Sequence, residues 1–383
     1  MKIHIIGGYF YPYLGPRSNR ITELTKEFIR LGHKVNVTII TETKGFDDVA
    51  YSKEIGINKW QNLRIYHKPA VGEKIVEGDK KNIPLIPTLH KWANYLMGGN
   101  EFHHSKIISK ALDIDDDTDM VIAISFPFQC IQGTSYYLKK HKPSKKGVLI
   151  AESSDPHHGN HRAPWFKYID KNAYSRFDYL TVPTPVAIPA YEGMMPKERI
   201  RVIPQGFNFD TVRLYTGERT APIKFAYSGS FFQGIRNPEF LFSYLNDQDM
   251  DYEFHWFMLY EEAQWIELLE RYPNLNAKTH RYTSLDRDTL IYELSKMDFL
   301  INIENSSATQ RPSKVIDYAL TGRPILSFNK DNFEAQKLMD YLNGNYHDAL
   351  EVDIAQYDIK NVAKQFLGLY EEKTGLTVTS LSK

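Results

Sequence analysis

Residues 312–328 read PSKVIDYALTGRPILSF, and this stretch decides the class of fold. Pro312 suits the first turn of a helix, because that turn does not need the missing N–H, and Gly322 suits the end of a helix. Between them, apolar residues recur at helical spacing, at Val315, Ile316, Ala319 and Leu320. The apolar run at 324–328 then predicts a buried strand. A helix that leads directly into a buried strand is typical of an α/β fold.

The amino end of this helix has the features of a phosphate site. Its first N–H groups, around Ser313, have no partner inside the helix, and Lys314 adds a positive charge. One turn further on, Asp317 would accept hydrogen bonds from ribose hydroxyls, so the three residues together predict a nucleoside diphosphate site. The alternative is a surface helix with a Lys314–Asp317 pair that contributes only about 0.2–0.5 kcal/mol. The helix follows the expected central strand at 298–304 through a polar loop, which favours the binding site.

Strand-like and helix-like segments alternate along the chain. The first half opens with the strand KIHIIGG at 2–8, followed by a helix from about Asn19 to Leu31. Further strands of the first half are expected at 34–40, 119–125, 147–153 and 179–184. Strands of the second half are expected at 223–231, 252–259, 298–304 and 324–328. Helices of the second half are expected at 237–245, 261–272, 287–297 and 313–320.

Two such runs, joined near residues 205–210, predict two Rossmann-like α/β domains that face one another, with ligands bound in the cleft between them. We expect an N-terminal, acceptor-binding domain at 1–205 and a C-terminal, donor-binding domain at 206–361. The last helix, at about 362–376, can pack back on the first domain. The length of 383 residues agrees with two domains, because single hydrophobic cores stop growing at roughly 250–300 residues.

The composition excludes several classes of protein. Lysine plus arginine and aspartate plus glutamate both total 47, so no overall field attracts nucleic acid. The single cysteine, Cys130, permits no internal disulfide and favours the cytoplasm. No apolar run approaches the roughly 18 residues of a membrane span. Residues 82–97, NIPLIPTLHKWANYLM, are interpreted as a core helix or as a peripheral contact with the inner face of a membrane.

The loop GGYFYPYLGPRSNR at 7–20 carries further candidate site residues. It follows the first strand, where an open α/β sheet binds ligands. The backbone N–H at Gly15 would approach a pyrophosphate, and Arg17 or Arg20 would add charge. A turn with polar residues that cap the following helix is the alternative interpretation.

The segment ESSDPHHGNH at 152–161 follows another expected strand. Asp155 and either His157 or His158 would contact the transferred sugar or the acceptor hydroxyl. Zinc binding is a weaker alternative, because zinc ligands normally come with cysteine or a further carboxylate at a defined spacing. The acidic run at 113–119 is interpreted as a solvated loop. We therefore expect no metal site.

Five segments together resemble glycosyltransferase family 4, whose members are retaining enzymes with the GT-B fold. RPSKVIDYALTGRPILSF at 311–328 resembles the donor-site helix and strand, and residues 9–39 resemble the N-terminal loop, helix and second strand. FAYSGSFFQGIRNPEFL at 225–241 resembles the glycine loop that opens the donor domain. IRVIPQGFNF at 200–209 resembles the domain junction, and LIAESSDPHHGN at 149–160 resembles the acceptor-side loop.

The resemblance implies a retaining, metal-independent hexosyl transfer from a nucleotide-diphosphate sugar to an acceptor hydroxyl, without a further cofactor. The acceptor would be a glycan or lipid-linked glycan in the assembly of a surface polysaccharide or glycoconjugate. Arg236, Lys314 and the backbone at Gly229 would hold the diphosphate. The first acid of the family's donor motif falls on Thr309, however, and its glycine-loop arginine falls on Ser230. Two alternatives therefore stay open, a catalytically inactive subunit that binds nucleotide or glycan and a sugar-nucleotide epimerase.

Overall fold

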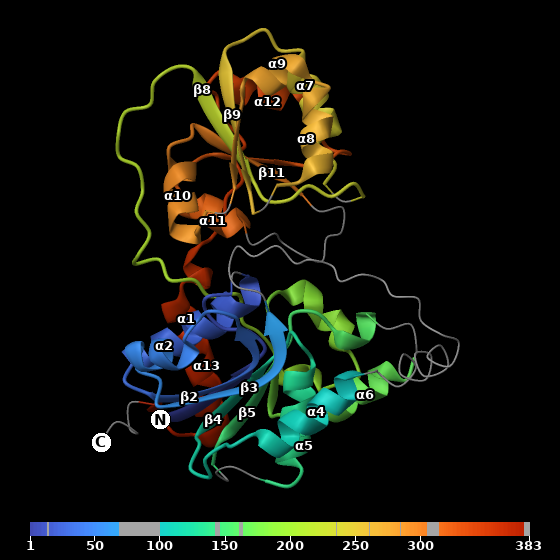
Figure 1. The fold of residues 1–383 in the computed structure, drawn as a ribbon, viewed down its shortest axis with the longest axis vertical. Helices are drawn as coiled ribbons and strands as arrows, with labels where there is room; N and C mark the ends of the chain where they lie inside the picture. Colours follow the sequence, from blue (N-terminus) through green and yellow to red (C-terminus); the bar gives the residue numbers. More distant parts are fainter. Residues whose placement is uncertain are drawn as a thin grey trace. The chain divides into compact units, whose positions relative to one another are not determined.

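The computed structural model describes residues 1–13, 15–68, 100–141, 146–160, 164–234, 236–259, 261–283, 285–304 and 314–378. Residue contacts divide the chain into two compact units (Figure 1). Unit 1 comprises Met1–Phe207 and Gln356–Lys383, and unit 2 comprises Asn208–Ala355. The boundaries predicted at residues 205 and 361 lie close to these limits. The predicted core helix or membrane contact at 82–97 lies outside the described residues.

Unit 1 is built on a parallel sheet of seven strands, in the order β3-β2-β1-β4-β5-β6-β7. The inner strands are apolar along almost their whole length, because helices cover both faces. The strands are β1 (Lys2–Gly7), β2 (Lys34–Thr43), β3 (Lys59–Lys68), β4 (Met120–Ile124), β5 (Val148–Glu152), β6 (Tyr179–Val182) and β7 (Ile200–Val202).

Two apolar clusters fix the helices of unit 1 on opposite faces of its sheet (Figure 1). One face packs against α1 (Pro16–Arg30), α2 (Asp48–Glu54) and α13 (Ile359–Thr374). The other face packs against α4 (Asn100–Ala111), α5 (Gln129–Leu138) and α6 (Phe166–Tyr174). Helix α13 packs against α1 although some 330 residues separate them, so the end of the chain completes the core of unit 1.

Unit 2 has a parallel sheet of five strands, in the order β10-β9-β8-β11-β12. The strands are β8 (Ile223–Ser228), β9 (Tyr252–Met258), β10 (Thr279–Thr283), β11 (Phe299–Ile303) and β12 (Ile325–Phe328). One face packs against α7 (Glu239–Asn246), α8 (Ala263–Glu270), α9 (Pro273–Ala277) and α12 (Ala335–Leu342). The other face packs against α10 (Arg287–Ser295) and α11 (Lys314–Leu320) (Figure 1).

Each sheet has one point where the order of the strands reverses. In unit 1 the chain runs outward from β1 to β3 and then returns to place β4 on the other side of β1. In unit 2 the corresponding point lies between β8 and β11. The carboxyl ends of the strands at such a switch point form the ligand crevice of open α/β sheets. The topology therefore predicts that ligands bind at the loops after β1, β4, β8 and β11.

The edge strands β3 and β10 and helix α12 were not predicted. Residues 279–283 are only partly buried in β10, so they lack the apolar run that marks an inner strand. Helix α1 begins at Pro16, three residues before the predicted start, because proline occupies its first turn. Among the described helices, none has both the length and the apolar character that a bilayer crossing requires.

Candidate functional site

The carboxyl end of β8 lies at the switch point of unit 2, and Gly229 follows it directly. Gly229 has a φ of 113°, a backbone conformation that glycine adopts far more readily than other residues. Its N–H donates to the carbonyl of Phe257 at 2.9 Å, which ties the loop to β9. A Cβ at Gly229 would lie 4.0 Å from Cδ of Lys314. The loop after β8 and the start of α11 therefore meet at this edge of the sheet.

Lys314 places a buried ammonium group at this point. Its Nζ has no hydrogen-bond partner among the described residues and lies 3.9 Å from the centre of the Tyr227 ring. Burial, with the nearby charge of Arg236, lowers the pKa of Lys314 well below its ordinary value of 10.5. A bound anion would act in the opposite direction, because an opposite charge favours the ammonium form.

Arg236 brings a second cation to the same loop. Its backbone N–H donates to the carbonyl of Phe232 at 2.8 Å and its carbonyl accepts from the N–H of Phe232 at 3.2 Å, so the loop closes on itself. The guanidinium lies 4.9 Å from the centre of the Phe232 ring. Its Nε is buried and has no hydrogen-bond partner in the part of the chain that the structure describes. Lys314 and Arg236 thus present unused donors that a phosphate can accept from.

Asp317, the predicted ribose acceptor, is paired with an arginine that sequence reasoning missed. Nε and Nη2 of Arg287 lie 2.8 and 2.7 Å from Oδ1 of Asp317. Burial raises the pKa of this carboxyl, and the guanidinium opposes the shift. Within the described residues, Oδ2 makes no hydrogen bond, so it is the oxygen that a ribose hydroxyl would meet.

The buried face of α11 differs from the predicted stripe. Val315 and Ile316 are buried as predicted, but Ala319 and Leu320 stay partly exposed. Tyr318 takes their place in the core, and its hydroxyl accepts a hydrogen bond from the N–H of Ser228 at 2.6 Å. The predicted stripe contained only apolar residues and therefore omitted Tyr318, which anchors α11 to the end of β8.

Of three further predicted positions in unit 2, only Ser230 lies among the described residues. Ser230 contributes its carbonyl, which accepts a hydrogen bond from the hydroxyl of Tyr227 at 3.1 Å. Thr309 and Ser313 lie outside the described residues, and so does Pro312 at the predicted helix start. Their roles stay predictions.

In unit 1, Arg17 joins the ends of β4 and β5 at the other switch point. Nη1 donates to the carbonyl of Ser125 at 2.9 Å and to Oγ of Ser154 at 2.8 Å. Nη2 lies 2.5 Å from Oδ2 of Asp155. Gly15 precedes α1, and no side chain caps the first turn of this helix. The structure therefore brings together Arg17 and Asp155, which were predicted from two separate loops.

His157 is held between two carboxylates. Its Nδ1 lies 2.8 Å from Oδ1 of Asp170, its Nε2 lies 2.9 Å from Oε2 of Glu101, and its ring stacks on Phe128 at 4.1 Å. Burial opposes the charged imidazole, but the two carboxylates raise the pKa of His157 to about 9. Because both ring nitrogens are engaged, the side chain would reach a sugar only by releasing Glu101. This arrangement is typical of a residue that shapes the loop after β5.

The partners that sequence reasoning missed share one property. Tyr227, Arg287, Glu101 and Asp170 contact predicted site residues from other elements of the same unit. The shortest separation among these contacts is 13 residues, between His157 and Asp170. A single sequence carries no local signal for a contact over such a distance along the chain. In the aspartate run at 113–119, Asp113, Asp116 and Asp117 are exposed, as a solvated loop predicts, whereas Asp115 pairs with Lys59 at 2.9 Å and accepts from Asn36 at 3.0 Å.

No family model matches this sequence, and a search of curated proteins finds no match. Solved structures do match. A glycosyltransferase from Rickettsia africae ESF-5 has a TM-score of 0.58 at 14% identity, over 97% of this chain and 98% of that chain. The apo form of the lipopolysaccharide outer core galactosyltransferase WaaB has a TM-score of 0.54 at 15% identity, over 100% of both chains.

The Anabaena protein Alr3699/HepE, in complex with UDP and glucose, has a TM-score of 0.54 at 11% identity, over 100% of this chain and 97% of that chain. At such low identity these similarities concern the fold alone. They span both units, and both units have the parallel, doubly covered sheet of a Rossmann-like domain. The predicted fold is confirmed: this chain has the GT-B fold.

Proposed function

We propose that this protein is a glycosyltransferase that moves a sugar from a nucleotide-diphosphate sugar to an acceptor hydroxyl. The observation that carries the proposal is the pair of cations Lys314 and Arg236, because Nζ of Lys314 and Nε of Arg236 are buried and have no hydrogen-bond partner among the described residues. They lie at the carboxyl edge of the sheet in unit 2, at its switch point. Isolated buried charges are costly, so a site of this kind is expected to be completed by an anion.

The chemistry fits the departure of a nucleoside diphosphate. As the bond to the sugar breaks, negative charge grows on the phosphate oxygen. Lys314, Arg236 and backbone N–H groups near Gly229 would stabilise this charge, and each such donor lowers a barrier by about 2.7–4 kcal/mol in comparable sites. We propose that the two cations carry this role without a metal ion. Asp317 would orient the nucleotide through its ribose.

Unit 1 would supply the acceptor side of the reaction. Arg17 holds Asp155 at the ends of β4 and β5. We propose that this carboxylate meets the acceptor or the transferred sugar. His157 would act through the loop that it fixes. Retention of the anomeric configuration rests on the resemblance to glycosyltransferase family 4 and forms part of the proposal, as does membership of that family.

The names of the structural neighbours support a role in surface glycan assembly. WaaB is described as a lipopolysaccharide outer core galactosyltransferase, and Alr3699/HepE was solved with UDP and glucose. We propose by analogy a uridine nucleotide sugar as the first donor to test, and a glycan or lipid-linked glycan as acceptor. Peripheral contact with the inner face of a membrane would give access to a lipid-linked acceptor.

Calorimetric titration with a panel of nucleoside diphosphates and their sugar conjugates, run beside an assay for nucleoside diphosphate release, tests the proposal. Lys314→Ala and Arg236→Ala should each weaken binding by about ten-fold or more, because a hydrogen bond to a charged group contributes about 1.5–3 kcal/mol. Lys337→Ala is the matched control, since Lys337 is an exposed lysine of the same unit, 3.2 Å from Glu334. Wild-type binding by both site variants would remove them from the site.

The Asp317→Asn variant distinguishes recognition of the ribose from recognition of the phosphates. This variant should weaken binding of UDP while leaving binding of pyrophosphate almost unchanged, because pyrophosphate has no ribose. Equal losses for both ligands would contradict the ribose role and point to the pairing with Arg287 as the cause. In wild-type protein, binding without release of nucleoside diphosphate would favour an inactive binding subunit. Release without a glycoside product would point to a reaction other than sugar transfer to an acceptor hydroxyl.

A further inference from the structure

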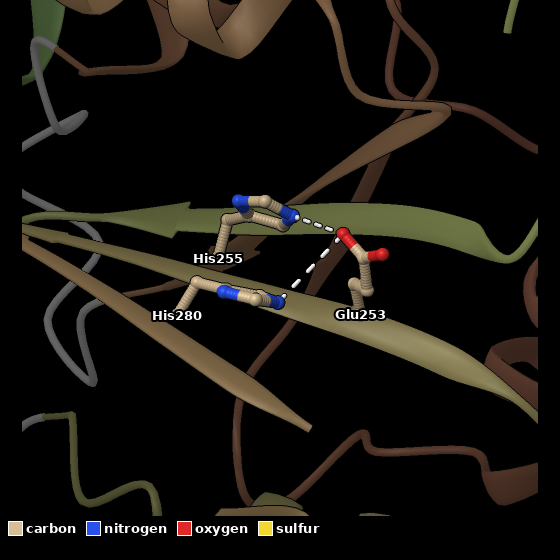
Figure 2. A group of neighbouring side chains, drawn as sticks. All are labelled: Glu253, His255 and His280. Atoms are coloured by element: carbon tan, nitrogen blue, oxygen red, sulfur yellow. Dashed lines mark hydrogen bonds and ion pairs between the residues drawn. The ribbon is translucent and has the colours of Figure 1, made fainter. Parts of the chain in front are cut away.

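A cluster of one carboxylate and two imidazoles lies on one face of the sheet in unit 2, away from the nucleotide site. Glu253 and His255 are two residues apart on β9, so their side chains point to the same face. His280 on the edge strand β10 pairs in register with His255, which brings it to that face as well. Figure 2 shows the three side chains converging from the two neighbouring strands.

The two imidazoles converge on the same carboxylate oxygen (Figure 2). Nε2 of His255 lies 3.2 Å from Oε2 of Glu253, and Nε2 of His280 lies 3.7 Å from it. All three candidate ligand atoms lie within 4.8 Å of one another. Ligands at 2.0–2.1 Å from a tetrahedral zinc ion are about 3.3 Å apart, so a shift of about one ångström would complete the geometry.

Tyr282 orients the more buried of the two rings. Its hydroxyl lies 3.1 Å from Nδ1 of His255. If Nδ1–H donates to this hydroxyl, the lone pair of Nε2 faces Glu253, which is the tautomer that binds a metal. A second contact that fixes the tautomer in this way is typical of histidines that bind metals. His280 is 51% exposed, so an ion can enter from solvent.

The alternative is an ordinary ion-pair cluster. Nζ of Lys224 lies 3.3 Å from the same Oε2 of Glu253, and it neutralises the carboxylate without a metal. The lysine is partly exposed, so it can swing away when a stronger cation arrives. The two interpretations make opposite predictions for Lys224, because the lysine stabilises the cluster in one of them and competes with the ion in the other.

We propose that Glu253, His255 and His280 bind one divalent transition-metal ion of the zinc type, with water in the remaining position. Two imidazoles and a carboxylate are a ligand set suited to such ions and poorly suited to Mg²⁺ or Ca²⁺. The ion links β10, an edge strand with one neighbour, to β9. Its role is structural, because Glu253 and His280 lie near the amino ends of their strands and His255 at the middle of β9, whereas Lys314 and Gly229 meet at the carboxyl end of β8.

Zinc binding by tag-free, chelator-stripped full-length protein tests the proposal. Titration of ZnCl2 against a chromogenic chelator should give one site per chain, and CoCl2 should give visible absorption bands of a tetrahedral ion. His280→Ala should weaken zinc binding by about ten-fold or more. Removing a residue that only contacts a metal ligand already weakens binding by about ten-fold, and His280 is itself a ligand in the proposed site. Lys224→Met should tighten zinc binding, because a competing cation is lost.

His347→Ala is the matched control. His347 is also 51% exposed in unit 2 and lies near a carboxylate, 3.6 Å from Asp340. Its variant should bind zinc as the wild type does. Zinc should also raise the melting temperature of the wild type but not that of His280→Ala, because a ligand that binds only the folded state stabilises it. A folded His280→Gln variant, checked by circular dichroism, replaces His280→Ala if the latter does not fold.

Equal zinc affinity in wild type and the His280 variant, or weaker affinity after Lys224→Met, would overturn the site. Absence of one-to-one binding to the wild type would overturn it too. None of these measurements involves nucleotide binding or sugar transfer, so the outcome is independent of the proposed function.

Discussion

Nζ of Lys314 lies 3.9 Å from the centre of the Tyr227 ring, and no described residue accepts a hydrogen bond from it. A cation–π contact contributes about 0.5–2 kcal/mol, whereas an isolated buried charge costs considerably more. The ring therefore compensates only part of the cost. A lysine in such a position destabilises the folded unit, and two predictions depend on that.

Lys314→Met should stabilise unit 2 while it weakens nucleotide binding. The substitution keeps most of the length of the side chain and removes a buried charge without a carboxylate partner, which is costly to hold in the protein interior. Hydrogen exchange of peptides from β8 and α11 measures the stability of unit 2 separately from unit 1. A variant that exchanges faster than wild type, yet binds nucleoside diphosphate equally well, would contradict the arrangement described for Lys314.

Binding of UDP should be coupled to uptake of a proton by Lys314. Burial lowers the pKa of this lysine well below 10.5, so at alkaline pH the unliganded protein loses the lysine proton more readily than a free lysine would. A diphosphate restores the charged form, because an opposite charge favours it. The terminal phosphate of unbound UDP has a second pKa of about 6, so it is already ionised at alkaline pH. It therefore releases no proton on binding that would mask the proton taken up by Lys314.

Calorimetry in buffers of different ionisation enthalpy measures this proton. The observed binding enthalpy should change with the buffer for wild type, in the sense of protons taken up from the buffer. Lys314→Met retains the Arg236 contact and should bind with an enthalpy that hardly depends on the buffer. The same dependence in both proteins would assign the proton to another group.

The sequence predicted the fold well, whereas the contacts among the candidate site residues could not be predicted from it. Inner strands such as β4 and β11 are continuous apolar runs, because both faces of each sheet are covered, so they are visible in the sequence. The edge strand β10 meets water and carries no such run. Arg17 was predicted from its place after the first strand, and Gly229 from the resemblance to a known family. The partners of Lys314 and Asp317 could not be predicted, because Tyr227 and Arg287 approach them only through the fold.

The stability of unit 1 should fall as the pH rises toward and through 9. His157 has a pKa of about 9 in the folded protein against 6.5 for the free side chain, so its contribution is fully present below pH 6.5 and is lost through pH 9. A shift of this size corresponds to about 3 kcal/mol. Urea unfolding of wild type and His157→Gln at pH 6.5 and 9.5 measures it.

The difference in free energy of unfolding between these two proteins should shrink at pH 9.5. His347→Gln is the control, because His347 is half-exposed and should show no such change. A difference that stays constant between the two pH values would mean that Asp170 and Glu101 do not hold a charged imidazole.

The buried pair of Arg20 and Glu152 should contribute more to stability than any exposed pair of α1. Nε of Arg20 lies 2.7 Å from Oε1 of Glu152, with side-chain exposures of 2% and 7%. Arg20 also donates to the carbonyls of Ile203 and Pro204, so it ties α1 to the segment that leaves unit 1. Removing one partner of such a pair costs about 3–5 kcal/mol, because the other charge stays buried.

Urea unfolding of a double-mutant cycle tests this. Arg20→Met should lower the free energy of unfolding by about 3–5 kcal/mol, and Arg20→Met with Glu152→Met should cost less than Arg20→Met alone, because no buried charge is left without a partner. Arg30→Met is the control on the same helix. The guanidinium of Arg30 is 56% exposed, although Glu27 is only 5% exposed, so water can replace part of the contact and its loss should cost less than that of Arg20. If the two single losses simply add in the double variant, the charges are not coupled, and the carbonyl contacts of Arg20 account for its effect.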